Sequence, residues 1–283
     1  MRSKETANLR PSPIAGQWYP GEPDLLAESV DRYLDAAQLP ELSGKILGIV
    51  APHAGHRYSG PVAGYAFKAI RGLQPDLVVI VSPMHHPHLQ PLITSAHDGY
   101  LTPLGPVPVD DDAVQTLDAR LRAVLGQGLT PIYRDSEHAL EIQVPFLQRA
   151  LPGAFKLLPV MMRDQGEAIA RALSQALAET LANRKFLMVA STDLSHFYNQ
   201  TTANKLDAEV LRRIEAYNPG GVLQVEQEGV GFACGRGAIA AVLWAAQALG
   251  GTSAKILHYA TSGDVTGDLS AVVGYGAAVI LGD

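Results

Sequence analysis

The chain has one cysteine, few aromatic side chains and no long apolar run, and these scarcities exclude several classes of protein. Cys234 has no partner for an intramolecular disulfide, which fits a reducing compartment, so we expect a cytoplasmic protein. The longest apolar stretch, 238–249, is too short to cross a bilayer and is interrupted by Gln247. Residues 1–16 carry charges and no apolar segment of the kind that a signal peptide needs. We therefore expect no membrane association.

A basic cluster and a phosphate-binding loop are also missing. Lys and Arg number 22 against 28 Asp and Glu, which gives a formal net charge of −6. Nucleic-acid binding requires clustered Lys and Arg, so we predict no nucleic-acid partner. Residues 229–237 read GVGFACGRG, but Cys234 replaces the third glycine of a dinucleotide motif and no predicted strand precedes the segment. A nucleotide cofactor is therefore not predicted.

Apolar residues make up 47% of the 283 residues, enough to bury a large core without disulfides. Unbroken apolar segments at 45–51, 77–82 and 186–191 are typical of parallel strands that are covered on both faces. Helical segments are predicted at 23–38, 61–70, 111–125, 137–151, 167–181, 205–217 and 236–249. This alternation predicts a single-domain α/β sandwich over residues 1–283, with a largely parallel central sheet. Two C-terminal strands, 255–261 and 270–281, are expected to form an antiparallel edge pair.

Six of the nine histidines follow the three apolar strands directly. They are His53 and His56 in loop 52–60, His85, His86 and His88 in loop 83–88, and His196 in loop 192–196. The carboxyl ends of parallel strands meet at one edge of a sheet, and ligands bind there. Because neutral imidazole is the commonest protein ligand for metals, the sequence predicts a metal site at this edge.

The histidines differ as candidate ligands. His53 and His196 each end a predicted buried strand in a loop that contains glycine or serine, so we predict functional roles for both. His85 and His86 are neighbours, so only one of the two is expected to face an ion. The other two histidines of these loops are expected at the surface or behind the ligands.

A catalytic metal needs about three protein ligands, and the residues leave the third one open. Asp193, Glu137 and Cys234 are the candidates. Cys234 comes just before a predicted helix, whose N-terminus would stabilise a thiolate, although a buried structural cysteine is the alternative. Glu137 and Glu141 open another predicted helix and share a face, so we predict that Glu137 or His138 lies near the site.

Six motifs, in order along the chain, resemble the Memo family, whose prokaryotic members are called AmmeMemoRadiSam system protein B. They are RPSPIAGQWYP at 10–20, APHAG at 51–55, SPMHH at 82–86, EHALEIQVP at 137–145, STDLSH at 191–196 and CGR at 234–236. The fold of this family is similar to that of class III, LigB-type extradiol dioxygenases, which hold non-haem iron on two histidines and a carboxylate.

The resemblance implies that His53 and His85 are metal ligands, and it selects His85 over His86. It further implies that Cys234 takes the place of the carboxylate and that His196 is the acid/base residue. A thiolate in this position suits copper or zinc as well as iron. We therefore expect iron as the cofactor, with copper or zinc as alternatives.

The sequence departs from the family pattern beside two of these residues. His56 stands where Memo proteins commonly have tyrosine, and Met84 stands where serine is usual between Pro83 and His85. The lining of the site is therefore expected to be particular to this branch.

The first functional hypothesis is a metal-dependent redox enzyme, similar to a dioxygenase, with an unknown small-molecule substrate. His196 would move a proton, and Asp193 or Glu137 would orient it. We predict four substrate-binding residues, of which the two arginines would bind an anionic group: Arg57, Arg236, His138 and His86.

Two alternatives remain open. The first is a metal-free enzyme in which Cys234 attacks and His196 or His53 acts as base. The second is a non-catalytic binding or signalling protein that keeps an enzyme-like cleft. The resemblance implies a radical-SAM protein and an AMMECR-type protein as partners.

Overall fold

Four parallel strands form the centre of the sheet in the computed structural model, which describes residues 8–283. They lie side by side in the order β2 (Lys45–Ala51), β9 (Phe186–Ser191), β3 (Leu77–Pro83) and β8 (Lys156–Met162). Three of them are the apolar segments that the sequence predicted. Their buried, mostly apolar residues favour strands that are covered on both faces.

Antiparallel strands flank this centre, so the sheet is mixed. β12 (Val272–Gly282) pairs with β2 on one side and with the edge strand β11 (Gly251–Thr261) on the other, and β10 (His196–Tyr198) pairs with its beginning. At the far side, β4 (Leu92–Ser95) runs antiparallel to β8 and parallel to β7 (Thr130–Ile132). The α/β class and the antiparallel C-terminal pair are confirmed, but the parallel arrangement holds only for the central strands, and β12 is an inner strand.

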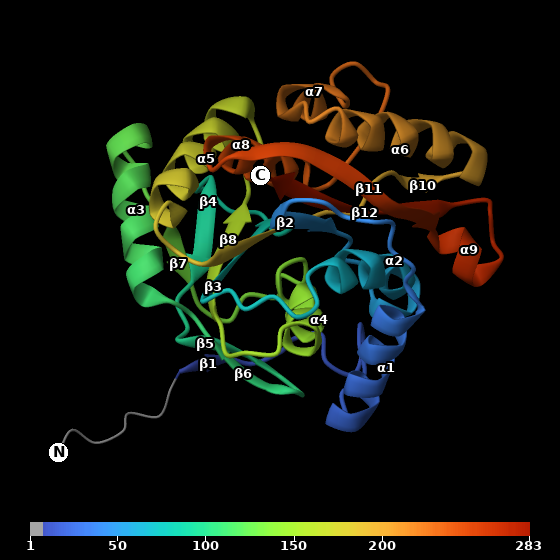
Figure 1. Ribbon diagram of the computed structural model, residues 1–283, viewed down its shortest axis with the longest axis horizontal. Coiled ribbons are helices and arrows are strands. Elements are labelled where there is room, and N and C mark those ends of the chain that lie inside the picture. Colours follow the sequence, from blue (N-terminus) through green and yellow to red (C-terminus); the bar gives the residue numbers. More distant parts are fainter. Residues whose placement is uncertain (1–7) are drawn as a thin grey trace.

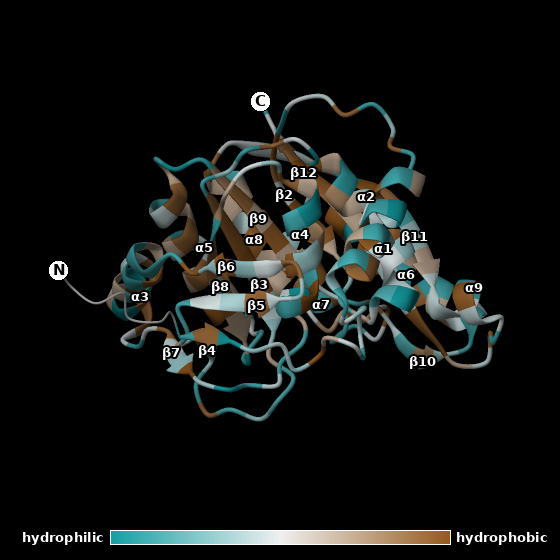
Figure 2. Cartoon of the chain, turned by 90° about the horizontal axis from the view of Figure 1, so that it is seen from below, coloured by the Kyte–Doolittle hydropathy of each residue, from teal (hydrophilic) through white to brown (hydrophobic). Residues whose placement is uncertain are grey.

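Helices cover both faces of the sheet (Figure 1). One layer contains α1 (Pro23–Ala36), α2 (His56–Ala69) and α4 (Val144–Ala150). The other layer contains five helices: α3 (Asp111–Leu125), α5 (Glu167–Leu181), α6 (Gln200–Glu215), α7 (Pro219–Gln224) and α8 (Arg236–Ala248). Figure 2 shows the apolar strands between helices whose outer faces are hydrophilic.

The side chains of β3 show how one sheet serves two cores. Leu77, Val79 and Val81 pack with the α5 and α8 layer, whereas Val78 and Ile80 pack with the α1 and α2 layer. This alternation follows from the two-residue period of a strand. Since both cores share the sheet, the described residues form a single domain.

A smaller sheet of β1 (Leu9–Arg10), β5 (Gly99–Thr102) and β6 (Gly105–Pro108) lies apart from the main one. A short helix, α9 (Ser262–Thr266), joins β11 to β12. Of the helices within residues 8–283, none is long and apolar enough to cross a membrane.

Three predicted helices begin elsewhere than expected, and one of them is α6, which begins at Gln200 and not at residue 205. The segment predicted as one helix over 137–151 is a turn followed by the 3-10 helix η1 (Glu141–Gln143) and α4. The Glu137 carboxylate accepts hydrogen bonds from the backbone N–H groups of His138 and Ala139, which holds the chain in a non-helical turn. α2 begins at His56, before the predicted start at residue 61.

Candidate metal centre

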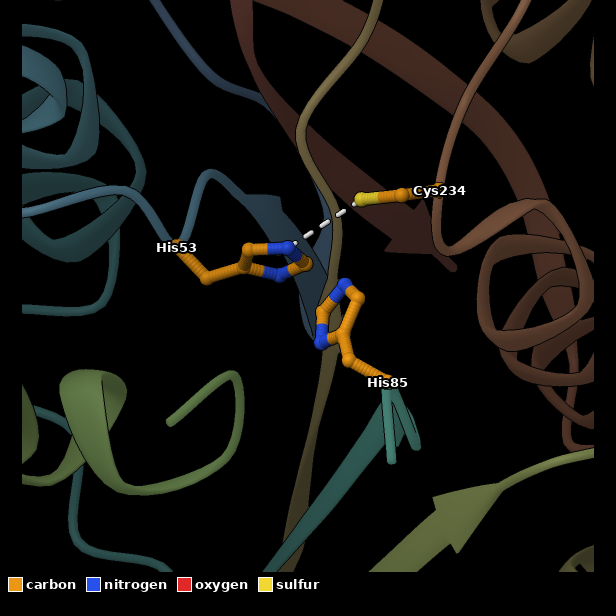
Figure 3. Close-up of side chains that lie close together, drawn as sticks. All are labelled: His53, His85 and Cys234. Atoms are coloured by element: carbon orange, nitrogen blue, oxygen red, sulfur yellow. Dashed lines mark hydrogen bonds between the residues drawn. The ribbon is translucent and has the colours of Figure 1, made fainter. Parts of the chain in front are cut away.

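Three side chains from distant parts of the chain meet at the carboxyl edge of the parallel strands. His53 follows β2, His85 follows β3, and Cys234 precedes α8. One ligand atom of each lies within 4.8 Å of the others, and the sulfur is 3.1 Å from His53 Nε2. Figure 3 shows both imidazole rings and the cysteine side chain pointing toward one another.

Ser191, the last residue of β9, hydrogen bonds to the ring nitrogen of His53 that does not face Cys234. The Ser191 hydroxyl donates its proton to the carbonyl of Ala139 at 2.6 Å, so it accepts hydrogen bonds from His53 Nδ1 at 3.0 Å and from Gln143 Nε2 at 2.7 Å. The proton of the neutral His53 ring is therefore on Nδ1. The lone pair of Nε2 faces Cys234.

His85 is held in the same way by a carboxylate. Glu137 accepts hydrogen bonds from His85 Nδ1 at 2.9 Å and from the His85 backbone N–H at 2.5 Å. Burial by itself would raise the pKa of Glu137, but these bonds and one from the Ala139 backbone lower it to about 2. The carboxylate is therefore ionised and directs His85 Nε2 into the cluster. Glu137 thus orients His85, and of the two residues predicted to orient His196 it leaves Asp193 as the candidate.

Cys234 is a protonated thiol in the absence of a metal. Burial raises its pKa far above the usual range, and the nearby Asp193 carboxylate raises it further. Of the two alternatives that the sequence left open, a thiolate and a structural cysteine, the raised pKa favours the second when no metal is bound. The Asp193 backbone N–H lies 3.2 Å from the sulfur and donates to it.

The donor set fits a transition-metal ion. Two imidazole lone pairs and one sulfur converge, and the second nitrogen of each ring is already occupied by a hydrogen bond. Such outer partners are typical of histidines that bind metals. A bound cation deprotonates a coordinating thiol, so the raised pKa of Cys234 does not oppose binding. Iron, copper and zinc all accept this set of ligands.

Asp193 lies beside the cluster, with its Oδ2 4.0 Å from His53 Nε2, and His196 is near enough to Asp193 and His85 for their charges to affect its pKa. Asp193 is buried, accepts a hydrogen bond from the His53 backbone N–H at 2.7 Å, and has its pKa raised by burial to about 6. Burial lowers the pKa of His196, whose Nδ1 has no hydrogen-bond partner within residues 8–283. The His196 ring is therefore neutral near pH 7.

Of the two histidines next to His85 and Glu137 in the sequence, His138 contacts the cluster and His86 does not. The His138 ring stacks on that of His85, with centroids 4.8 Å apart, and lies 5.5 Å from that of His53. His86 faces away and pairs with the Ser136 hydroxyl at 3.0 Å. The structure thus brings His85, and not His86, into the cluster.

The two arginines predicted to bind substrate lie elsewhere. Arg236 forms an ion pair with Glu226 at 2.6 Å and lines a separate cleft. Arg57 is exposed, and its guanidinium lies 5.8 Å from the centre of the Tyr58 ring. Neither of them lines the cleft of about 480 Å³ that lies beside the cluster.

Sequence reasoning did not single out the polar side chains behind the ligands. Ser191 and Gln143 stand within the family motifs, but no spacing rule shows that they meet at His53. Arg10, also in a motif, is buried and bonds to Asp135, to Glu141 and to the carbonyl of Glu137. It thereby fixes the turn that carries Glu137.

His56 was expected at the surface or behind the ligands, and it is almost fully buried. It is the first residue of α2 and packs its ring on Phe146, with centroids 4.7 Å apart. Its Nε2 donates to the carbonyl of Ile142, and burial lowers its pKa to about 4.

Comparison with known proteins decides the family. The model of the Memo-like protein family matches residues 10–279. The chain belongs to the Memo-like family. A MEMO1 family protein of Nitrosopumilus maritimus is 35% identical over 274 residues, which cover 95% of this chain and 98% of that protein. A MEMO1 family protein of Thermotoga neapolitana is 37% identical over 284 residues, with 96% and 99% covered.

Membership of the Memo-like family was the expectation drawn from the six motifs, and it is confirmed. Another similar protein is a MEMO1 family protein of Methanopyrus kandleri, 35% identical over 276 residues that cover 94% of this chain and 96% of that one. Among solved structures, that of an uncharacterized protein from Escherichia coli K12 aligns with 84% of this chain and 100% of its own, at 12% identity and a TM-score of 0.46.

Proposed function

We propose that this Memo-family chain is a redox enzyme that binds one iron ion, with copper as the alternative, through His53, His85 and Cys234. The observation that carries the proposal is the convergence of two imidazole nitrogens and one sulfur within 4.8 Å of one another. Iron or copper held there would supply electron-transfer chemistry to a small-molecule substrate. Zinc also suits these ligands but has no redox chemistry.

His196 is the residue best placed to move a proton. Burial lowers its pKa, and the Asp193 carboxylate partly offsets this effect. A neutral imidazole whose Nδ1 has no partner in the described part of the chain can accept a proton from a substrate at neutral pH. Asp193 keeps the His53 loop in position through the His53 backbone N–H.

The metal-free nucleophilic mechanism receives less support. Only a thiolate attacks efficiently, and burial keeps Cys234 protonated. Within residues 8–283, the groups hydrogen bonded to its sulfur belong to His53, Thr192 and Asp193, and burial keeps His53 neutral. No fixed positive charge among them would stabilise the thiolate.

Elemental analysis tests the proposal. The protein is purified without oxygen and without a histidine tag as wild type, His53→Ala, Cys234→Ser and His86→Ala. We expect near-stoichiometric iron or copper in the wild type and in His86→Ala, and loss of the metal from the other two variants. His86 is the matched control because it adjoins His85 but faces Ser136.

Three outcomes would contradict parts of the proposal. Absence of metal from the wild type, even after reconstitution, would overturn the metal centre. Zinc alone would leave the centre and remove the redox role. Stoichiometric iron or copper without oxygen consumption, across a panel of catechol-like compounds, would favour the non-catalytic binding protein.

A further inference from the structure

A second cleft, of about 780 Å³, lies at the carboxyl edge of the sheet, next to the backbone of Cys234. Residues from the loop after β3, the loop after β8 and the start of α8 line it. Among them, Gln165 donates a hydrogen bond from Nε2 to the Cys234 carbonyl at 2.6 Å, whereas the Cys234 sulfur faces His53. None of the three proposed metal ligands is among the described residues that line this cleft, so it is separate from the metal centre.

Positively charged side chains outnumber negatively charged ones in the second cleft. Arg163 and Arg236 line it together with one acidic residue, Asp164, although the whole chain has a formal net charge of −6. The Asp164 carboxylate already accepts a hydrogen bond from the Gly166 backbone N–H at 2.7 Å. A lining with a positive net charge attracts an anionic ligand and disfavours a cationic one.

Both arginines have hydrogen-bond donors available for a ligand. Arg163 directly follows β8 and is exposed, and none of the ion pairs within residues 8–283 includes it. Arg236 pairs with Glu226 through Nη1 at 2.6 Å, and no hydrogen bond among the described residues uses its Nε or Nη2. A guanidinium group can bind a phosphate with two parallel hydrogen bonds. Two arginines at one cleft therefore suit a phosphate group, which carries up to two charges.

Neutral polar side chains occupy much of the remaining lining. Gln90 and Gln127 are exposed, and within residues 8–283 no hydrogen bond uses their side-chain amides. His88 Nδ1 accepts the Gln90 backbone N–H at 3.1 Å, so a neutral His88 ring carries its proton on Nε2 and can donate it to a ligand. Such amide and imidazole groups pair with hydroxyl groups. The volume is that of a site for a whole small molecule and exceeds the needs of a phosphate ion.

We infer that the second cleft binds a small phosphorylated molecule that also carries hydroxyl groups. Its phosphate group binds to Arg163 and Arg236, and its hydroxyl groups pair with Gln90 and Gln127. This ligand is distinct from a substrate of the metal centre, so the inference does not depend on the proposed function. It keeps the anion-binding role that the sequence predicted for Arg236 and assigns that role to a different site.

Four probes test the charge and the hydroxyl groups separately. They are ribitol 5-phosphate, ribonate, ribitol and inorganic phosphate, titrated calorimetrically into the full chain in a buffer without phosphate. We expect ribitol 5-phosphate to bind at least about tenfold more tightly than each of the other three. Equal binding of ribitol would overturn the role of the arginines, and equal binding of inorganic phosphate would overturn the role of the hydroxyl groups. No binding of any probe would overturn the whole inference.

Variants of exposed residues locate the binding in this cleft. Arg163→Gln should weaken binding of ribitol 5-phosphate and of inorganic phosphate at least about tenfold, because a charged donor pair is lost. The matched control is Arg32→Gln, since Arg32 is an exposed arginine of α1 outside the cleft, and it should bind like the wild type. Gln127→Ala should weaken binding of ribitol 5-phosphate and leave that of inorganic phosphate unchanged. Wild-type binding by Arg163→Gln would place the probes elsewhere and contradict the inference.

The role of Arg236 has a control of its own. Arg236→Gln should weaken binding of ribitol 5-phosphate by about the same factor as Arg163→Gln. Glu226→Gln removes only the ion-pair partner of Arg236, so it should bind the probe at least as tightly as the wild type. Equal losses in Arg236→Gln and Glu226→Gln would show that the ion pair, and not a contact of Arg236 with phosphate, is what binding requires. That result would overturn the assignment of Arg236.

The metal centre and the second cleft can fail separately. His53→Ala removes a proposed metal ligand and leaves the lining of the second cleft unchanged, so it should bind ribitol 5-phosphate like the wild type. Loss of binding in this variant would place the phosphate on the metal ion and contradict the inference. A wild type that holds metal but binds no probe would overturn the phosphate site and leave the metal centre.

Discussion

His85 Nδ1 donates a hydrogen bond to Glu137 Oε1 at 2.9 Å, and this bond leaves Nε2 facing Cys234 and His53. The same carboxylate accepts the backbone N–H of His85, so it fixes both the ring and the loop that carries it. The position of one proposed ligand thus depends on a residue 52 positions further along the chain.

Removing the charge of Glu137 should weaken metal binding. Carboxylates behind ligating histidines orient the ring and raise its basicity, and their loss lowers metal affinity by roughly 10–100-fold. We expect Glu137→Gln to show a loss of this size in competition with a chelator. Glu215→Gln, an exposed change on α6, is the control and should retain wild-type affinity. Equal metal affinity of Glu137→Gln and Glu215→Gln would show that Glu137 does not support metal binding through His85.

The ionised state of Glu137 should also appear in the stability at acid pH. The pKa of this carboxyl is lowered from 4.5 to about 2. Because the folded value is the lower one, Glu137 stabilises the fold above about pH 4.5, and this contribution is lost as the pH falls toward 2.

When the pH is lowered from about 5 to about 3, the free energy of unfolding should fall less for metal-free Glu137→Gln than for the metal-free wild type. The difference between the two losses should be roughly 2 kcal/mol. Urea unfolding at each pH measures this difference. Glu215→Gln should behave like the wild type. Parallel stability profiles for Glu137→Gln and the wild type would show that this carboxyl titrates normally.

Ser191→Ala should destabilise the protein even without metal. The hydroxyl is fully buried and bonds to His53, Gln143 and the carbonyl of Ala139. Its removal leaves buried polar groups unpaired, at a cost of about 2–4 kcal/mol. Chemical denaturation would show the loss. Ser174→Ala, whose hydroxyl bonds within residues 8–283 only to the Arg171 carbonyl of its own helix, should cost less than about 1 kcal/mol. A similar small cost at both positions would contradict this account.

Gly274 on β12 should not tolerate a side chain. A Cβ atom there would lie 1.9 Å from Asp207 Oδ2, and Asp207 is fully buried. The Asp207 carboxylate accepts hydrogen bonds from the Ser195 backbone N–H at 2.8 Å and from the Tyr259 hydroxyl at 2.7 Å. Gly274→Ala should therefore cost about 3 kcal/mol and disturb the loop that carries His196.

Thermal unfolding measures the effect of Gly274→Ala. Gly153→Ala is the matched control, because no atom lies within 4 Å of a Cβ at that position. The control should unfold close to the wild-type temperature. Equal unfolding temperatures for the two variants would show that Asp207 can move without cost.

Much of the fold was predictable because the central strands are buried on both faces. Such strands need contiguous apolar residues, so the predicted limits of β2 and β9 agree with the structure. The helix predicted over 137–151 was wrong at its start, because the buried Glu137 carboxylate binds backbone N–H groups there. An apolar period of 3.6 residues cannot reveal that competition.

The sequence by itself determined the α/β class, the Memo-like family and the meeting of histidine-bearing loops at one edge of the sheet. The class and the meeting of the loops follow from local properties, namely apolar runs and the residues that come directly after them, whereas the family follows from the resemblance of six motifs. Only the tertiary structure decided that His85 faces the cluster, that Glu137 and Ser191 hydrogen bond to the two rings, and that the surroundings of Cys234 raise the pKa of its thiol. The direction of a side chain and the pKa of a buried group depend on neighbours distant in the chain, which residue spacing does not specify.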